Sequence, residues 1–225
     1  MNKLKMFFTS IVLMAIVFAM IVVVALIYSA TNRSQIKSYV FQMGNYPSER
    51  VGELQALQNM SPDNLRNKLI KKYISEYFKV IPGDTGVLNR PVLRLLSDST
   101  SSVFADWQSG EATKITEMSA KRMFRIVSIA DGDIAPYNKT TNSDENSGKM
   151  YYAVRYNTLT WKDSNIMGTE PFVEPGILYI EIEFEPKIRQ TTEGKPLDVR
   201  QYLQEGGDPS CLFRFRVSNI RGRLI

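Results

Sequence analysis

The residues of this chain that could carry chemistry lie mainly on two alternating stretches near the C-terminus. Glu181, Glu183 and Glu185 alternate with apolar residues in the first, and Arg214 and Arg216 do so in the second. Residues spaced by two share one face of a strand. Three interpretations follow: the charges pair across neighbouring strands, they form a docking face for a partner protein, or the carboxylates are catalytic. Catalysis is the weakest of the three, because no pocket signal accompanies the carboxylates.

The composition excludes most familiar catalytic and metal chemistry. The 225 residues contain no histidine and one cysteine, Cys211. A Ser-His-Asp triad, a Cys-His pair, a His-ligated metal, a zinc-finger framework and an intrachain disulfide are therefore ruled out. No Gly-rich phosphate loop occurs, and the acidic residues of segment 131–149 lack the spacing of an EF-hand. We expect a protein that is not an enzyme and has no cofactor or metal.

An uncharged apolar segment occupies residues 6–28. As a helix rising about 1.5 Å per residue, it can cross a hydrocarbon core of about 30 Å. It is longer than the apolar region of a signal peptide, which favours an uncleaved anchor over a cleaved signal or a buried soluble helix. Lys3 and Lys5 favour a cytoplasmic N-terminus. We therefore predict a short cytoplasmic tail over residues 1–5 and a transmembrane helix over residues 6–28.

The chain beyond the membrane segment begins with helical patterns. Residues 29–60 are mostly polar and are interpreted as a stalk. A helix is predicted from Pro62 to Ile81, with Ser61 as its N-cap and an apolar stripe along one side. A second helix is predicted over residues 91–108, although the serines at its centre either weaken it or split it into two. Both helices belong to the region that we expect to fold.

Strand periodicity follows the helices. Strands are predicted over four ranges: 121–130, 150–161, 177–185 and 211–217. In the last of these, alternation places Cys211 inward as an inert thiol and Leu212 outward. Helices followed by strands predict an α+β domain over residues 61–225, with helices packed on a four-stranded antiparallel sheet.

The element order resembles a known family. A single N-terminal span, a stalk, a helix like Asn64–Val80, a strand like Tyr151–Trp161 and a last strand like Cys211–Val217 are similar to the bitopic inner-membrane assembly component of bacterial type IV secretion and conjugation systems. The resemblance implies the cone-like fold named after nuclear transport factor 2 for the periplasmic domain. Members often carry an Asn-Pro-x-Gly turn implicated in subunit contacts. This chain has Asp208-Pro209 at that place without the motif.

The resemblance implies a non-catalytic scaffold of a secretion or conjugative transfer channel. It implies a bacterial inner-membrane protein with a cytoplasmic N-terminus and a periplasmic domain. Its partners would be other channel subunits and copies of itself, without direct nucleic-acid binding. The residues predicted to contact partners are Tyr73, Tyr77, Arg155, Glu181, Glu183, Asp208, Pro209, Arg214 and Arg216.

Two alternatives stay open. One is a membrane-anchored ligand-binding or enzymatic domain of the same cone fold, with tyrosines such as Tyr73 and Tyr77 lining a pocket between helix and sheet. It needs an ionisable residue that faces inward from segment 121–129 or 151–159. The other is an inner-membrane platform protein of a type IV pilus or type II secretion machine. Such a protein would show a longer coiled coil after the membrane than residues 29–60 do.

Overall fold

The computed structural model describes Met20 and residues 47–137, 148–162, 170–190 and 197–224. The chain divides into two units, Met1–Tyr46 and Pro47–Ile225, and the fold described below is that of the second. The predicted membrane segment lies outside the described residues except for Met20, which is helical. Within the described ranges, no helix combines the length and the apolar character needed to cross a membrane.

Helices form most of the first half of the folded unit. Their bounds are α2 Pro47–Gln58, α3 Pro62–Phe78, α4 Pro91–Leu96, α5 Val103–Ser109 and α6 Glu111–Ala120, with α7 Val199–Gln204 later in the chain. Leu54 and Leu57 of α2 belong to the hydrophobic core. The segment that the sequence analysis assigned to a stalk therefore enters the folded unit from Pro47 onward.

Helix α3 confirms the strongest helix prediction at its start. Ser61 is the N-cap, and its hydroxyl accepts the backbone N–H of Asn64 at 3.4 Å. The helix ends before the predicted Ile81, because Val80 leaves the helix and bridges to Arg125 on the first strand through two hydrogen bonds of 3.1 Å. Its core side chains are those of the predicted stripe: Leu65, Leu69, Ile70, Tyr73, Ile74 and Phe78.

The second predicted helix is two helices. Residues 97–102 interrupt it, because Ser97 bridges to Val217 of the last strand and the Asp98 N–H donates to Val217 O at 2.8 Å. Helix α6 was missed. Its buried residues, Ala112, Ile115 and Ser119, recur at the three- and four-residue spacing of a helix face, but Ile115 is the single large apolar side chain among them.

The sheet is antiparallel throughout, with the order β1-β3-β4-β5 and β2 paired to β3. The strands are β1 Phe124–Ser128, β2 Ile134–Pro136, β3 Lys149–Trp161, β4 Phe172–Ile188 and β5 Phe213–Leu224. Five strands replace the predicted four, because β2 forms within the segment expected to be a loop. The α+β class is confirmed.

The last predicted strand begins two residues late. Cys211 and Leu212 belong to a short 3₁₀ turn, η3 (Pro209–Leu212), and the strand starts at Phe213. Both residues are buried. The inward position of Cys211 was correct, whereas the outward position of Leu212 was wrong because a 3₁₀ turn does not follow the two-residue alternation of a strand.

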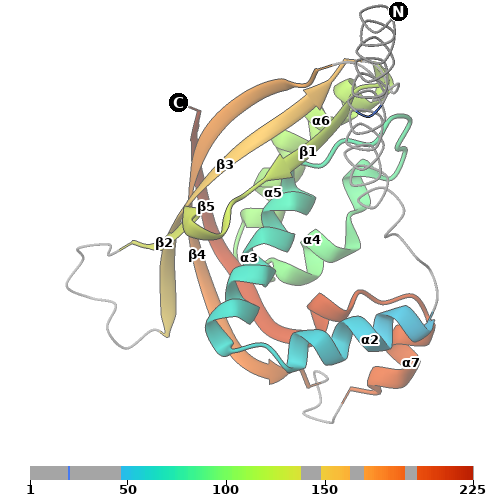
Figure 1. The fold of residues 1–225 in the computed structure, drawn as a ribbon, viewed down its shortest axis with the longest axis vertical. Coiled ribbons are helices and arrows are strands. Elements are labelled where there is room, and N and C mark those ends of the chain that lie inside the picture. The colour runs from blue at the N-terminus through green and yellow to red at the C-terminus, as the bar shows by residue number, and fades with distance from the viewer. Residues whose placement is uncertain (1–19, 21–46, 138–147, 163–169, 191–196, 225) are drawn as a thin grey trace, which may run out of the picture. The chain divides into compact units, whose positions relative to one another are not determined.

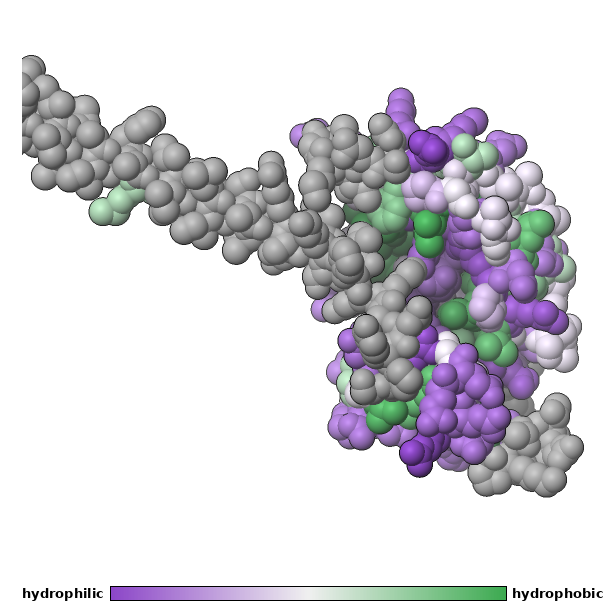
Figure 2. Space-filling model, turned by 90° about the vertical axis from the view of Figure 1, so that its right-hand side faces the viewer, coloured by the Kyte–Doolittle hydropathy of each residue, from purple (hydrophilic) through white to green (hydrophobic). Residues whose placement is uncertain are grey.

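The core lies between α3 and the concave face of the sheet. Figure 1 shows the long strands β3 and β4 curving around α3, α4 and α5, while α2 and α7 lie together at one end of the domain. The inward side chains of the sheet include Val154, Ile180, Ile182, Phe215 and Val217, all at most 1% exposed. On the face shown in Figure 2, hydrophilic residues predominate and apolar residues form small groups.

Candidate docking surface

The predicted charge pairing between β4 and β5 is present. Glu183 lies opposite Arg216 and Glu185 lies opposite Arg214 in the strand register. Arg214 Nη1 is 3.1 Å from Glu185 Oε2, with both side chains about half exposed. We call these residues, Glu183, Glu185, Arg214 and Arg216, the charge ladder. The Arg214–Glu185 pair confirms the cross-strand interpretation and contributes about 0.2–1 kcal/mol, whereas Glu183 and Arg216 lie opposite each other without a close ion pair.

Glu181 has a different environment from its two neighbours. Its Oε1 accepts hydrogen bonds from Lys149 Nζ and Ser218 Oγ, each at 2.8 Å, and the residue is 9% exposed. Ser218 reaches the carboxylate because the register of β4 and β5 shifts between Glu181 and Ile182. Glu181 therefore ties β3, β4 and β5 together and presents little surface to a partner.

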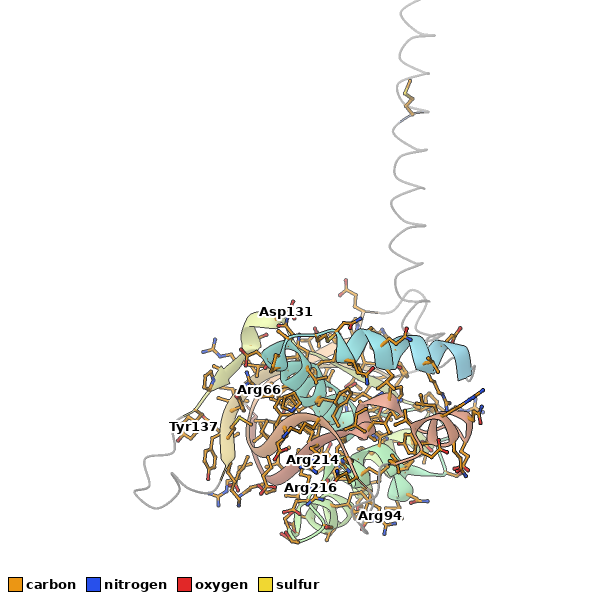
Figure 3. The ribbon with its side chains drawn as sticks, turned by 90° about the horizontal axis from the view of Figure 1, so that it is seen from below. Arg66, Arg94, Asp131, Tyr137, Arg214 and Arg216 are labelled. Atoms are coloured by element: carbon orange, nitrogen blue, oxygen red, sulfur yellow. The ribbon has the colours of Figure 1, made fainter. Side chains whose placement is uncertain are left out.

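A hollow of about 420 Å³ opens beside the charge ladder. It is lined by Arg94, Leu95, Ser97, Asp98, Ser99, Ser101, Phe104, Ala105, Arg189 and Arg216. These residues come from α4, the connection to α5, α5 itself, the end of β4 and β5. Arg94 and Arg216 are labelled in Figure 3. Three arginines face one carboxylate here, so the hollow is electropositive.

Arg189 forms the fixed side of the hollow. Its Nε donates to Phe213 O at 2.7 Å and its Nη2 donates to Phe215 O at 2.6 Å. Burial lowers the pKa of Arg189 below its usual value, yet a guanidinium keeps its charge in proteins. The side chain thus covers two carbonyls along β5 while it holds a positive charge in place.

Asp98 is bound mainly by its own loop. Its carboxylate accepts hydrogen bonds from Thr100 N at 3.1 Å and Thr100 Oγ1 at 2.7 Å. Partial burial would raise the pKa of Asp98, but these hydrogen bonds and the charges of Arg216 and Lys149 outweigh burial and lower it. The carboxylate is therefore ionised at neutral pH and does not form a close ion pair with Arg216.

The other predicted contact residues lie elsewhere. Tyr73 has no exposed surface and its hydroxyl is 3.3 Å from Ser97 Oγ. Tyr73 is therefore a core residue that no partner can reach in this structure. Tyr77 is partly buried, and burial raises its pKa to about 12. Arg155 is exposed on β3, on the sheet face away from the core.

The predicted turn at Asp208 and Pro209 starts η3. The Asp208 carboxylate caps the turn by accepting from Ser210 N at 3.0 Å, and it lies 2.8 Å from Lys72 Nζ of α3. Burial would raise the pKa of Asp208, but Lys72 and Ser210 together lower it. Pro209 is buried. The turn therefore fastens the start of β5 to α3.

Two buried arginines were missed by the sequence analysis. Arg125 of β1 points inward, donating from Nε to Phe78 O at 2.7 Å and from Nη2 to Glu111 Oε1 at 2.7 Å. Arg90 donates to the carbonyls of Glu76 and Lys79. These carbonyls belong to the end of α3, where helical partners are lacking. No sequence signal marks them, because arginine is mostly a surface residue.

The predicted tyrosine pocket is filled by packing. Tyr77 contacts Phe78 and Trp107 edge to face, with ring centroids 4.8 and 6.4 Å away, and Phe78 stacks on Tyr156 at 5.0 Å. Trp107 Nε1 also donates to Tyr77 O at 3.0 Å. The tyrosines therefore line an aromatic core rather than a pocket.

These features define an α+β domain in which the buried arginines Arg90 and Arg125 are engaged in the fold and the exposed arginines Arg94 and Arg216 line a surface hollow. No protein-family model matches the chain, and no curated protein matches it. Among solved structures, it is similar to CagV, a VirB8 homolog of the T4SS of Helicobacter pylori strain 26695. The TM-score is 0.45 and the identity 10%, over 70% of this chain and 98% of that chain. A likeness of this size does not by itself assign a family or a function.

Proposed function

We propose that the chain is a non-catalytic, membrane-anchored scaffold subunit of a bacterial type IV secretion or conjugative transfer channel. Its folded domain would bind other subunits of the channel. The proposal rests on the apolar segment over residues 6–28, on the element order of the domain and on where its charges lie. We include in this proposal a role in assembly of the channel or pilus and in conjugative transfer.

The main support for a non-catalytic role is that the inward-facing guanidinium of Arg125 is already bound within the fold. An enzyme or ligand-binding domain of this architecture would need an ionisable group that faces inward, and Arg125 is such a group. Its guanidinium is bound to Phe78 O and to Glu111, so it is committed to the fold. Two exposed arginines, Arg94 and Arg216, line the surface hollow. Available charge on a surface suits docking better than catalysis.

The location follows from the predicted anchor. The N-terminus would be cytoplasmic and the domain periplasmic, in the bacterial inner membrane. Fusing alkaline phosphatase after Ile225 tests this, because the reporter folds to an active form only where its disulfides form. We expect an active fusion. If the phosphatase fusion is inactive, and a reporter that fluoresces only in the cytoplasm is fluorescent at the same position, the domain is cytoplasmic and the proposed orientation is wrong.

The partner class is tested by cross-linking in native membranes, purification of this chain and mass spectrometry. We expect a secretion ATPase and outer channel subunits to co-purify, together with further copies of the chain. Recovery of pilus or type II secretion components instead would support the platform-protein alternative. Recovery of the chain alone would remove the scaffold proposal.

A further inference from the structure

We propose that the hollow beside the charge ladder binds an acidic peptide segment of a partner protein, through carboxylates held by Arg94 and Arg216. This inference rests on the proposed scaffold function and names the contact through which a partner would be recognised. The chemical class of the ligand is an extended, carboxylate-bearing segment with an apolar side chain beside the carboxylate.

The two arginines have the freedom that such a contact needs. The side chains of Arg94 and Arg216 are exposed, and neither guanidinium forms a hydrogen bond or ion pair with another residue in the described part of the chain. Arg214 is two residues from Arg216 on the same strand and is paired with Glu185. The difference is local, because Asp98 is engaged by Thr100 instead of neutralising Arg216.

The surroundings are prepared for a carboxylate. Arginine binds carboxylates with two parallel hydrogen bonds. Arg189 adds a third positive charge whose position is fixed by its bonds to Phe213 O and Phe215 O. A ligand carboxylate would therefore meet one positive charge, that of Arg189, which needs little rearrangement, and this lowers the entropic cost of binding.

The other lining residues favour a peptide over a phosphate or a lipid headgroup. Leu95 is 43% exposed and lies with Phe104 on the wall, so an apolar side chain can be buried there. Asp98 is the single carboxylate of the lining and can accept N–H groups of a peptide backbone, which inorganic phosphate lacks. A volume of about 420 Å³ holds a short segment and excludes a folded surface.

Photo-cross-linking in cells tests the contact directly. The photoreactive amino acid p-benzoylphenylalanine is placed at position 95 of the full chain, and the cross-linked peptide is identified by mass spectrometry. We expect a segment of another protein rich in Asp and Glu. The cross-link should be lost with Arg216→Ala and kept with Arg214→Ala, a matched control on the same strand.

A binding assay separates specific recognition from general attraction. The full chain in neutral detergent is titrated into a fluorescein-labelled peptide, Gly-Asp-Leu-Glu-Asp-Phe, and into a copy with Lys at the acidic positions. We expect binding of the acidic peptide only, weakened about tenfold or more by Arg94→Ala or Arg216→Ala and little by Arg214→Ala. Unchanged thermal unfolding of each variant shows that the fold is intact.

The outcomes separate this inference from the proposed function. Equal binding of the acidic peptide to wild type and to Arg216→Ala overturns the inference, and so does displacement by inorganic phosphate or by phosphatidylglycerol vesicles. If channel subunits co-purify equally well with Arg94→Ala and Arg216→Ala, the scaffold function stands and this contact is wrong. If the cross-linked acidic segment belongs to a protein outside any secretion channel, the contact stands and the scaffold function is wrong.

Discussion

Arg125 Nη2 lies 2.7 Å from Glu111 Oε1, and both side chains are largely buried, with 9% and 14% of their surface exposed. The same guanidinium donates to Phe78 O and lies 5.5 Å from the Phe78 ring centroid. A residue of β1 thus joins the start of α6 to the end of α3. The ion pair is part of the frame on which the sheet and the helices meet.

We predict that removing this arginine is among the most damaging single changes in the domain. Arg125→Met leaves the Glu111 carboxylate and the Phe78 carbonyl buried without their donor, and should lower the free energy of unfolding by about 3–5 kcal/mol. Denaturant unfolding followed by tryptophan fluorescence measures it. Lys114→Ala is the control, because Lys114 is 74% exposed and 3.7 Å from the same carboxylate; it should cost less than about 1 kcal/mol. A cost that small for Arg125→Met would contradict the prediction.

Gly176 of β4 should not tolerate alanine. A Cβ at this position would lie 2.4 Å from Tyr156 Cζ, and the Tyr156 ring is held by stacking on Phe78. Gly176→Ala should therefore destabilise the domain by about 1–3 kcal/mol. Gly52 in α2 has nothing within 4 Å of its Cβ position, so Gly52→Ala should stabilise by about 0.5–1 kcal/mol. Thermal unfolding of the two variants should shift in opposite directions, and a shift in the same direction would count against the packing described here.

The Lys72–Asp208 pair should make stability depend on pH at the acid end. The pKa of Asp208 is lowered in the folded state, so its contribution is present above the unfolded pKa of about 3.9 and is lost as pH falls through the folded value. The pKa of Lys72 is raised, so its share is kept below the unfolded value of about 10.4 and lost only at higher pH. Neutral pH therefore retains both contributions.

Asp208→Asn should cost about 1 kcal/mol at neutral pH through loss of the ion pair with Lys72, because the asparagine amide oxygen still accepts from Ser210 N and keeps the cap of η3. The variant should also show a smaller loss of stability between about pH 5 and pH 2 than the wild type. Lys72→Met supplies the control, since the double variant should be less destabilised than the sum of the single variants. Parallel pH profiles for wild type and Asp208→Asn would argue against the coupling.

Cys211 should be unreactive in the native protein. Burial raises the pKa of this thiol to about 12, so hardly any thiolate is present near pH 8. It is the single cysteine of the chain, which makes a thiol-reactive dye a clean probe. Labelling should be negligible in native buffer and complete in concentrated urea. Rapid labelling of the folded protein would show that the η3 turn opens readily.

Sequence patterns predicted the structural features that depend on a single helix or strand. Ser61 and the apolar stripe located α3, and two-residue alternation placed the ladder charges on one face of their strands. Of the predicted contact residues, the structure brings Arg216 together with the hollow, while Arg214 and Glu183 lie on the ladder beside it. The helix stripe and the shared face of the charges depend on side-chain period alone, whereas the hollow does not.

Features that depend on distant parts of the chain were not predictable. Arg90 and Arg125 are buried because carbonyls at the end of α3 need donors, which becomes clear only once α3, β1 and α6 are assembled. The hollow has the same origin, since Arg94 and Arg189 are about a hundred residues apart and lie on different elements. The burial of Tyr73 likewise follows from the sheet packed over α3.

Helix α2 gives the domain a mechanical property. It is the element next to the N-terminal unit along the chain, and Leu54 and Leu57 are its buried attachments, while Arg50 Nη1 reaches Leu203 O at 3.5 Å. A force applied to the chain before Pro47 therefore acts on α2 first and is transmitted to the sheet only through this helix. Peeling this helix away would lengthen the tether by up to about 3.5 Å for each residue released, while the strands stay folded. The first helix of the domain can thus yield under tension before the sheet does.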